Sequence, residues 1–334
     1  MEQTSRKLLT LLAVAALVGG GYFLVNYRLE LVPSEDGSRY IKITPRSEAA
    51  SDTSLPPPGR GRTLAAPIRI ATWNLAGLDA RRWSGQQVND VLVHILSRFE
   101  LIALQGVRAD QEGLLLKLID QLNAAGARYD IAADRSRQPD ASLLCGALLF
   151  DRDAIEIDLA LAEAVADPTG SFLHRPLVAT FRVRGPKPDE AFTFKLINVH
   201  TDADRAEEEL DLLDDVYRAV RDDGQEDDIL VVGDFATDCE NLGPLGQMLD
   251  MTCLIRRTPT TLRGTLPVDN ILLHRRATTE YTGRSGVLDI MREFGLSSVA
   301  AREITEHLPV WAEFSPYEGG SVVLRDGEEG VAEL

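Results

Sequence analysis

Short apolar runs, separated by polar and glycine-containing segments, occupy most of the chain between residues 67 and 316. Runs of strand length occur at residues 68–74, 101–105, 143–150, 154–159, 177–183, 192–199, 229–232, 268–273 and 310–314. Apolar residues spaced three or four apart predict helices near Ser84, where Gln87 completes a capping-box pattern, near Asp204, and at residues 115–122. Strands and helices alternate, strands without helices follow, and the alternation then returns. This order predicts an α/β domain of two packed sheets with helices outside.

A different pattern precedes this domain, because residues 8–25 carry no charge and follow Arg6 and Lys7. At about 1.5 Å per helical residue the run spans roughly 27 Å, close to the hydrocarbon core of a bilayer. We therefore expect residues 1–7 to be a cytoplasmic N-terminus and residues 8–25 a single-pass transmembrane anchor, with the domain outside the cytoplasm. A cleaved signal peptide, followed by secretion, is the alternative. The apolar run continues past the glycines at 19–21, which disfavours cleavage.

The segments on either side of the domain are poor in residues that build a core. Residues 26–66 interleave prolines with serine, glycine and charged residues, and we expect them to form a linker. Within it, the alternating residues 39–44 favour a short strand. Residues 317–334 are rich in glycine and glutamate, and we expect a flexible acidic tail there. One domain, residues 67–316, remains between linker and tail.

The formal net charge of −17 at pH 7 restricts the binding partners. Such a chain repels the phosphate backbone of nucleic acids unless a basic patch or a metal ion intervenes, so nonspecific nucleic-acid binding is disfavoured. The three cysteines lack the spacing of a metal site. Cys145 lies in an apolar run and is expected to be a buried free thiol, whereas Cys239 and Cys253 are close enough in sequence to pair across a loop.

Polar side chains stand where the predicted strands end or begin: Asn74, His200, Asp234, Asp269 and His307, the last preceded by Glu306. Asp234 directly follows a buried strand, and the carboxyl edge of strands is where ligands collect in α/β sheets. Carboxylates bind hard divalent cations through oxygen, and a histidine–aspartate pair activates water. Together these residue types indicate phosphoester cleavage.

The motifs around these residues resemble those of the endonuclease/exonuclease/phosphatase superfamily, the group of DNase I, the exonuclease III type repair nucleases, sphingomyelinases and inositol polyphosphate 5-phosphatases. The resembling stretches are residues 72–75, 175–176, 197–200, 232–235, 267–271 and 307–310. They follow the family's order across nearly all of residues 67–316. The resemblance implies a four-layered α/β sandwich of two mixed β-sheets flanked by helices.

The same resemblance assigns roles to single residues. His200 contacts the phosphate, and Asp234 assists the nucleophile or the leaving group. Asp269 orients His307, which acts on water or phosphate. Support of the phosphate and of a metal ion falls to Asn74 and Arg175.

Four positions depart from the family pattern. Gly106 stands where the family has its principal metal-binding glutamate, and glycine has no ligand atom. Ala236 replaces an asparagine that donates hydrogen bonds to the phosphate, and the loss of one such donor typically costs 10²–10³ in rate. Glu306 replaces an aspartate, which makes it a candidate metal ligand with its carboxylate one methylene further out. Asn270 stands where many members have histidine or tyrosine.

Two classes of function therefore remain open. In the first, the protein is a membrane-anchored, weakly active or inactive relative whose metal site is degraded, and the fold acts as a binding module. In the second, it is a working phosphoesterase or nuclease that uses Mg²⁺ or Mn²⁺, with Glu306, Asp110 or Glu112 in place of the missing carboxylate. The expected partners are a phosphoester substrate or a partner protein, and the membrane through residues 8–25.

Overall fold

The computed structural model describes residues 27–33, 39–45, 66–75, 80–83, 85–108, 112–124, 126–133, 144–158 and 162–320. The chain divides into two compact units, Met1–Asp52 and Thr53–Leu334. The predicted anchor at residues 8–25 lies outside the described residues, as does most of the predicted tail. Within the described part of the chain, no helix is long and apolar enough to cross a membrane.

The first unit contains a β-hairpin inside the predicted linker. Strand β2 (Arg39–Pro45) pairs antiparallel with β1 (Tyr27–Pro33). The short strand expected at residues 39–44 is therefore present. Its partner was not predicted, although residues 27–33 also alternate between apolar and charged side chains, as a hairpin strand does.

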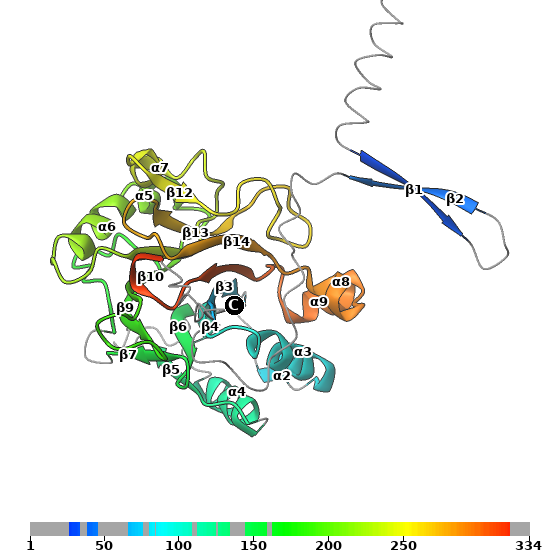
Figure 1. The fold of residues 1–334 in the computed structure, drawn as a ribbon, viewed down its shortest axis with the longest axis horizontal. Helices are drawn as coiled ribbons and strands as arrows, with labels where there is room; N and C mark the ends of the chain where they lie inside the picture. Colours follow the sequence, from blue (N-terminus) through cyan, green and yellow to red (C-terminus); the bar gives the residue numbers. More distant parts are fainter. Residues whose placement is uncertain are drawn as a thin grey trace, which may run out of the picture. The chain divides into compact units, whose positions relative to one another are not determined.

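The second unit contains two mixed β-sheets (Figure 1). The first sheet has the strand order β14-β15-β3-β4-β6-β5, and the second sheet has the order β12-β13-β11-β10-β9-β7, with β8 paired to β9. The bounds in the first sheet are β3 Ile68–Asn74, β4 Leu101–Arg108, β5 Tyr129–Ala133, β6 Leu144–Asp151, β14 Tyr281–Val287 and β15 Val310–Phe314. Those in the second are β7 Ile155–Ile157, β8 Glu163–Ala164, β9 Leu177–Val183, β10 Thr193–His200, β11 Ile229–Asp234, β12 Met251–Cys253 and β13 Asp269–His274.

Helices cover the outer face of each sheet. The helices against the first sheet are α2 Ala80–Trp83, α3 Gln86–Leu96, α4 Glu112–Ala124, α8 Ile290–Phe294 and α9 Ser298–Ile304. Those against the second are α5 Ala206–Leu210, α6 Leu213–Arg221 and α7 Gly243–Gln247. In Figure 1 the two helical groups stand on opposite sides of the strands. The prediction of two mixed sheets with flanking helices is confirmed.

Two helix starts differ from the sequence prediction. Helix α3 begins at Gln86 with Gly85 in the N-cap position and no side-chain cap bond, and Ser84 lies outside the described residues. The single helix expected from Asp204 is two helices, α5 and α6. Glu209 of α5 is buried, and its carboxylate accepts hydrogen bonds from the backbone N–H groups of Leu173 and Asp202. The spacing of apolar residues along a helix does not indicate such tertiary hydrogen bonds, so it could not predict the break between α5 and α6.

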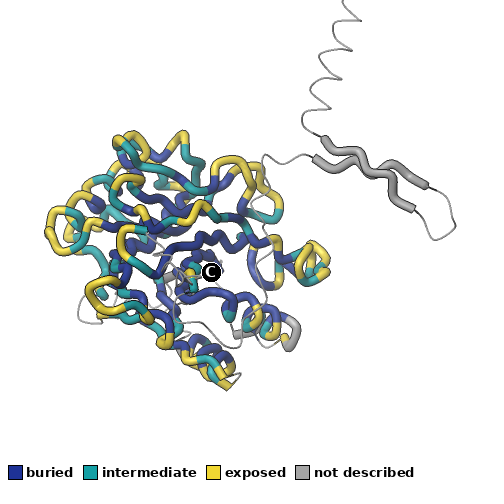
Figure 2. Tube along the Cα trace, viewed as in Figure 1, coloured by how far each residue is buried: buried dark blue, intermediate teal, exposed yellow. Residues whose placement is uncertain are grey.

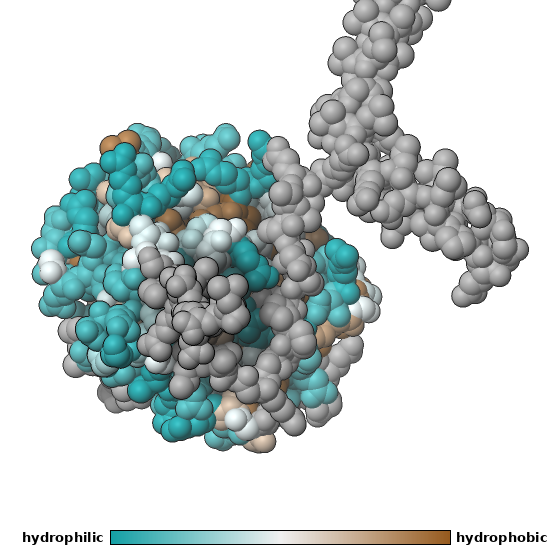
Figure 3. All heavy atoms as spheres, in the orientation of Figure 1, coloured by the Kyte–Doolittle hydropathy of each residue, from teal (hydrophilic) through white to brown (hydrophobic). Residues whose placement is uncertain are grey.

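The core of the described residues consists of three apolar clusters. Figure 2 shows that the buried positions lie mainly along the strands. The middle cluster lies between the sheets, where stacked phenylalanine rings from both sheets meet, among them Phe192 and Phe314 with centroids 5.9 Å apart. The central strands β3 and β11 are buried on both faces, which explains why they read as continuous apolar runs. The face shown in Figure 3 is mostly hydrophilic outside the grey atoms.

Two parallel strand pairs and a disulfide shape one edge of this sandwich. Strand β3 runs parallel to β4, and β10 runs parallel to β11, so four carboxyl ends are available for side chains. Cys239 in the loop after β11 and Cys253 of β12 form a disulfide with Cα atoms 6.2 Å apart, as their spacing allowed. The side chain of Cys145 lies outside the described residues, so its burial stays a prediction.

Candidate active site

Three predicted residues of the second sheet lie on neighbouring strands in one register. His200 at the end of β10 pairs with Asp234 at the end of β11, and Asp234 pairs with Asp269 at the start of β13. Neighbouring strands are about 4.8 Å apart, so these side chains meet at one edge of the sheet. Gly233 precedes Asp234 with φ 146°. A Cβ at this position would lie 1.9 Å from the carbonyl oxygen of Val199, so only glycine fits there.

His307 reaches this edge from the loop before β15. Its backbone N–H donates to the hydroxyl of Thr305, and that hydroxyl donates to the carbonyl oxygen of Asn74 at 2.7 Å. Its carbonyl oxygen accepts the indole N–H of Trp73 at 3.1 Å. A β-bridge to Thr261 holds the other side of the loop. The loop is therefore attached to β3 of the first sheet and to the loop before β13.

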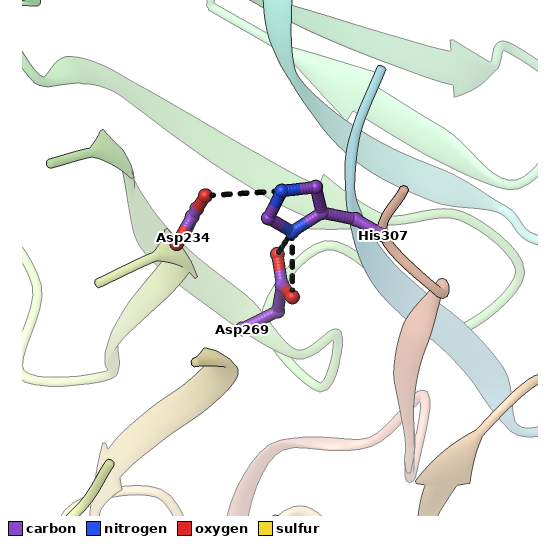
Figure 4. A group of neighbouring side chains, drawn as sticks. All are labelled: Asp234, Asp269 and His307. Atoms are coloured by element: carbon purple, nitrogen blue, oxygen red, sulfur yellow. Dashed lines mark hydrogen bonds and ion pairs between the residues drawn. The ribbon is translucent and has the colours of Figure 1, made fainter. Parts of the chain in front are cut away.

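Asp234, Asp269 and His307, which we call the histidine group, lie together in Figure 4. Nδ1 of His307 is 3.1 and 3.0 Å from the two carboxylate oxygens of Asp269, and Nε2 is 3.7 Å from Oδ2 of Asp234. Asp269 is fully buried, and its backbone N–H donates to the Thr260 hydroxyl at 2.9 Å. The imidazole thus stands between two buried carboxylates.

Asn74 connects the first sheet to this group. Its amide Nδ2 donates to Oδ2 of Asp234 at 2.8 Å and is 3.3 Å from Nε2 of His200. Oδ1 of Asp234 accepts the backbone N–H of Ala236 at 2.9 Å. The structure therefore brings together all five polar residues predicted at the strand ends.

Burial and charge shift the pKa of three of these residues. Burial, and then the charge of Asp234, raises the pKa of Asp269 to about 6. Burial alone would lower the pKa of His307, but the hydrogen bond and charge of Asp269, together with Asp234, raise it to about 9. Burial and the neighbouring His174 and His307 lower the pKa of His200 to about 3. At pH 7, His307 is therefore a cation between anions, and His200 is neutral.

His174 is a neighbour that the sequence prediction missed. Its ring stacks on that of His200, with centroids 4.4 Å apart and planes 9° from parallel. The one available signal was its position directly before the Arg175–Pro176 motif, which ends where β9 begins. Arg175 is half-buried beside it, and its contact with a phosphate stays a prediction.

The residues expected to replace the missing metal ligand do not join the histidine group. Glu306 is exposed, and its backbone carbonyl accepts the N–H of Leu262. Asp110 and the side chain of Glu112 lie outside the described residues. Within the described part of the chain, the ligand atoms that gather here within 4.8 Å of one another belong to Asp234, Asp269 and His307.

Two of the four positions that depart from the family pattern, Gly106 and Ala236, have left-handed backbone. Gly106 has φ 67°, in an irregular stretch of β4 where the register with β6 shifts between Leu104 and Val107. The positive φ accompanies this irregularity, because a bulge turns the chain out of the regular strand conformation. Ala236 has φ 54°, a conformation that alanine adopts at a cost.

The magnesium centre that the resemblance implies lacks one ligand position, although Asp234, Asp269 and His307 form a group that could hold a metal ion. Gly106 supplies no oxygen at the position of the principal ligand. The protonated imidazole of His307 offsets one of the two negative charges of Asp234 and Asp269. A cation of the usual kind would have to replace that proton before it could bind.

Comparison with known proteins identifies the family of this chain. The Endonuclease/Exonuclease/phosphatase family profile matches residues 71–297. Deoxyribonuclease-1-like 1 of Chlorocebus aethiops is 26% identical over 275 residues, which cover 77% of this chain and 88% of that protein. Deoxyribonuclease-1 of Sus scrofa is 26% identical over 269 residues, which cover 74% and 91%.

Solved structures show the same fold. Humanized TDP2 of D. rerio, with 14 mutations, has a TM-score of 0.53 at 14% identity and covers 75% of this chain and 99% of its own. An endonuclease/exonuclease/phosphatase from Bacteroides vulgatus has a TM-score of 0.52 at 12% identity, with 75% and 99% covered. Since the family profile spans more than half of its length, this chain belongs to the endonuclease/exonuclease/phosphatase family.

Proposed function

We propose that this protein is a weak phosphodiesterase that reacts at the histidine group. One observation supports the proposal most strongly: His307 stands between the buried Asp269 and Asp234, beside Asn74 and His200. A histidine held through one nitrogen by a buried carboxylate has its other nitrogen free for proton transfer. The fold alone would not support an activity, because function depends on the site.

In this proposal, Asp269 orients the ring through Nδ1, and Nε2 of His307 faces the phosphate. The raised pKa of His307 means that Nε2 carries a proton at pH 7. It therefore serves the reaction as a proton donor to the leaving oxygen, or as a charge that binds a phosphoryl oxygen. Asn74 fixes Asp234, which assists the attacking or leaving group, and the neutral His200 contacts the phosphate.

The activity is expected to be low because two supports are missing. Members of this family generally depend on a divalent metal ion, and Gly106 offers none of the usual ligand atoms. Ala236 offers no amide donor to the phosphate, a loss typically worth 10²–10³ in rate. We therefore treat the metal site as degraded.

The proposed substrate is an accessible phosphodiester and not a nucleic acid bound nonspecifically, because the net charge is −17. The loop that bridges to His307 carries three exposed arginines, Arg256, Arg257 and Arg263. They place positively charged side chains on a loop next to His307 in an otherwise acidic protein. The named relatives are deoxyribonucleases, so an accessible single strand of DNA is one substrate to include.

The test is hydrolysis of bis(p-nitrophenyl) phosphate by the full chain in detergent, with Mg²⁺, Mn²⁺ or EDTA. We expect slow turnover by the wild type and a loss of 100-fold or more in His307→Ala. His94→Ala, which changes an exposed histidine of α3, is the matched control and should keep the wild-type rate. An unchanged rate in His307→Ala would overturn the proposal.

A second candidate, a binding module without catalysis, is favoured by the backbone at Gly106. This position is left-handed, so the glutamate of the family pattern would be strained there. Binding of the diester by the folded wild type, with no product in any of the three buffers, would support this candidate over the weak enzyme.

For location, we propose a single-pass anchor at residues 8–25 with the domain outside the cytoplasm. The support is the uncharged run behind Arg6 and Lys7. The measurement is carbonate washing of membranes from cells that express the intact chain. Release of the protein into the soluble fraction, at full or reduced length, would contradict the anchor and favour secretion after cleavage.

A further inference from the structure

A second group of acidic residues lies at the other end of the strand that carries Asp234. It consists of Asp228, directly before β11, Glu280, directly before β14, and Glu318 of the 3₁₀ helix η3 (Glu318–Gly320). We call it the carboxylate group. At about 3.3 Å per residue, the length of β11 places it roughly 20 Å from the histidine group.

Buried oxygen atoms in this group lack hydrogen-bond partners. Glu280 is 1% exposed, and its Oε1 accepts the backbone N–H of Gly319 at 2.6 Å. Its Oε2 is buried with no hydrogen-bond partner among the described residues, and the same holds for Oδ1 of Asp228, which is 4% exposed. Buried polar atoms are almost always satisfied, so these two oxygens indicate a missing partner.

Basic side chains nearby do not supply that partner. A cavity of about 960 Å³ opens beside the group and is lined by Asp228 and Glu318, together with three arginines. Each arginine pairs with a different carboxylate: Arg218 with Asp214, Arg221 with Asp222, and Arg276 with Asp250. Within the described part of the chain, no ion pair involves the carboxylate group.

The electrostatic consequence is strong repulsion. Burial, and then the charges of Glu280, Glu318 and Glu226, raises the pKa of Asp228 to about 8. Burial also raises the pKa of Glu318. Three carboxylates this close repel one another when ionised, and a bound cation would offset that repulsion.

We propose that Asp228, Glu280 and Glu318 form a binding site for a hard divalent cation such as Ca²⁺. Their ligand oxygens lie within 4.8 Å of one another. Calcium–oxygen distances are about 2.3–2.6 Å, so oxygens on opposite sides of one ion are about 5 Å apart at most. The three residues therefore reach a common ion without rearrangement, and the cavity leaves room for water as further ligands.

Such an ion would connect three segments that are distant in sequence. Glu318 already accepts the backbone N–H of Thr193 at 3.2 Å, and its own N–H donates to the carbonyl of Glu190. The cation would add bonds to the start of β11 and to the turn before β14. It therefore holds η3 against the second sheet, and it stabilises the folded protein by mass action.

The experiment is thermal unfolding of the full chain in detergent, in EDTA and with CaCl₂ or MgCl₂ added. At a cation concentration 100-fold above Kd, we expect the wild-type Tm to rise by about 5 °C or more. In Glu280→Gln the rise should fall below about 1 °C, and Asp227→Asn, an exposed neighbour in the same cavity, should keep it. Asp234→Asn should also keep it, because that change affects only the histidine group.

The Tm shift of each variant is measured against the same variant in EDTA, so the effect of the cation can be measured even in a less stable variant. Asp228→Asn replaces Glu280→Gln if the latter does not fold. A wild type with no shift in either ion, or a full shift in both Glu280→Gln and Asp228→Asn, overturns the site. Loss of the shift in Asp234→Asn alone would assign the ion to the histidine group and would also overturn it. None of these outcomes depends on phosphodiesterase activity.

Discussion

Each end of β11 carries a group of buried carboxylates. The two groups differ in whether a basic side chain lies among the carboxylates. At the carboxyl end, Asp234 and Asp269 are buried around the imidazole of His307. At the amino end, Asp228 and Glu280 are buried with Glu318 at their open side and no basic side chain between them. The first group contains its own cation. The second must take a proton or a metal ion from solution.

This difference concerns how each group balances its charge. In the histidine group, protonated His307 offsets part of the negative charge of Asp269 and Asp234. These two carboxylates in turn raise the pKa of His307 to about 9. In the carboxylate group, burial and then the charge of Glu280 raise the pKa of Asp228. The site suited to a hard cation is thus the one that no motif predicted.

Removing the internal cation should have the largest effect. We expect His307→Leu to lower the free energy of unfolding by about 3–5 kcal/mol at pH 8, because two buried carboxylates lose their partner. The loss should shrink towards pH 5, where Asp269, with its pKa of about 6, becomes protonated. Urea unfolding at both pH values measures it. In metal-free buffer Glu280→Gln should instead raise the free energy of unfolding. Equal stability of His307→Leu and wild type would show that His307 does not offset the buried carboxylates, which would contradict the contrast between the two groups.

The pH dependence of the carboxylate group should have the next largest effect. The pKa of Asp228 is raised from 3.8 to about 8 on folding, so the folded state holds the proton more tightly. This contribution is fully present below pH 4 and is lost as the pH rises through 8. In EDTA, Asp228→Asn should therefore gain on the wild type with rising pH, by on the order of 1–3 kcal/mol at pH 8.

The control for this measurement is Asp227→Asn, since Asp227 is exposed. Its difference from the wild type should not change with pH. Because His307 also has a raised pKa, wild-type stability falls between pH 6.5 and 9 for a second reason. The His307 contribution cancels in the difference between the unfolding free energies of Asp228→Asn and the wild type. If that difference stays constant from pH 4 to 8, the pKa of Asp228 is not raised in the folded protein.

Giving the histidine group an additional carboxylate should have the smallest effect on stability. Gly106→Glu is expected to cost about 1–2 kcal/mol, because residue 106 has φ 67°. Ala236→Asn should cost nothing, because asparagine tolerates left-handed backbone better than alanine. The double variant should bind Mn²⁺, measured by titration calorimetry, and hydrolyse the diester faster than the wild type.

The triple variant with His307→Ala is the control for that gain. A gain in hydrolysis that survives His307→Ala would come from another site. A folded double variant that is no faster than the wild type would show that the missing ligand is not what limits the reaction.

Much of the candidate site was predictable because its residues stand next to strands. Asn74, His200, Asp234 and Asp269 are the last or first residues of apolar runs, and strand pairing places such positions at one edge. The stacking of His174 on His200 was not predictable, because His174 belongs to an irregular segment whose path no period describes. The bulge at Gly106 was missed for a similar reason, since a register shift arises from pairing between β4 and β6.

The sequence by itself determined the elements of this protein, because burial requires apolar residues at strand and helix spacing. It also determined which chemical groups stand at the strand ends. Only the tertiary structure decided which charges meet. Asp228, Glu280 and Glu318 are separated by 52 and 38 residues in the chain, and each alone reads as an ordinary surface acid. Their proximity and burial follow from how the second sheet, β14 and η3 pack together, and charge interactions depend on distance and burial, which no local pattern records.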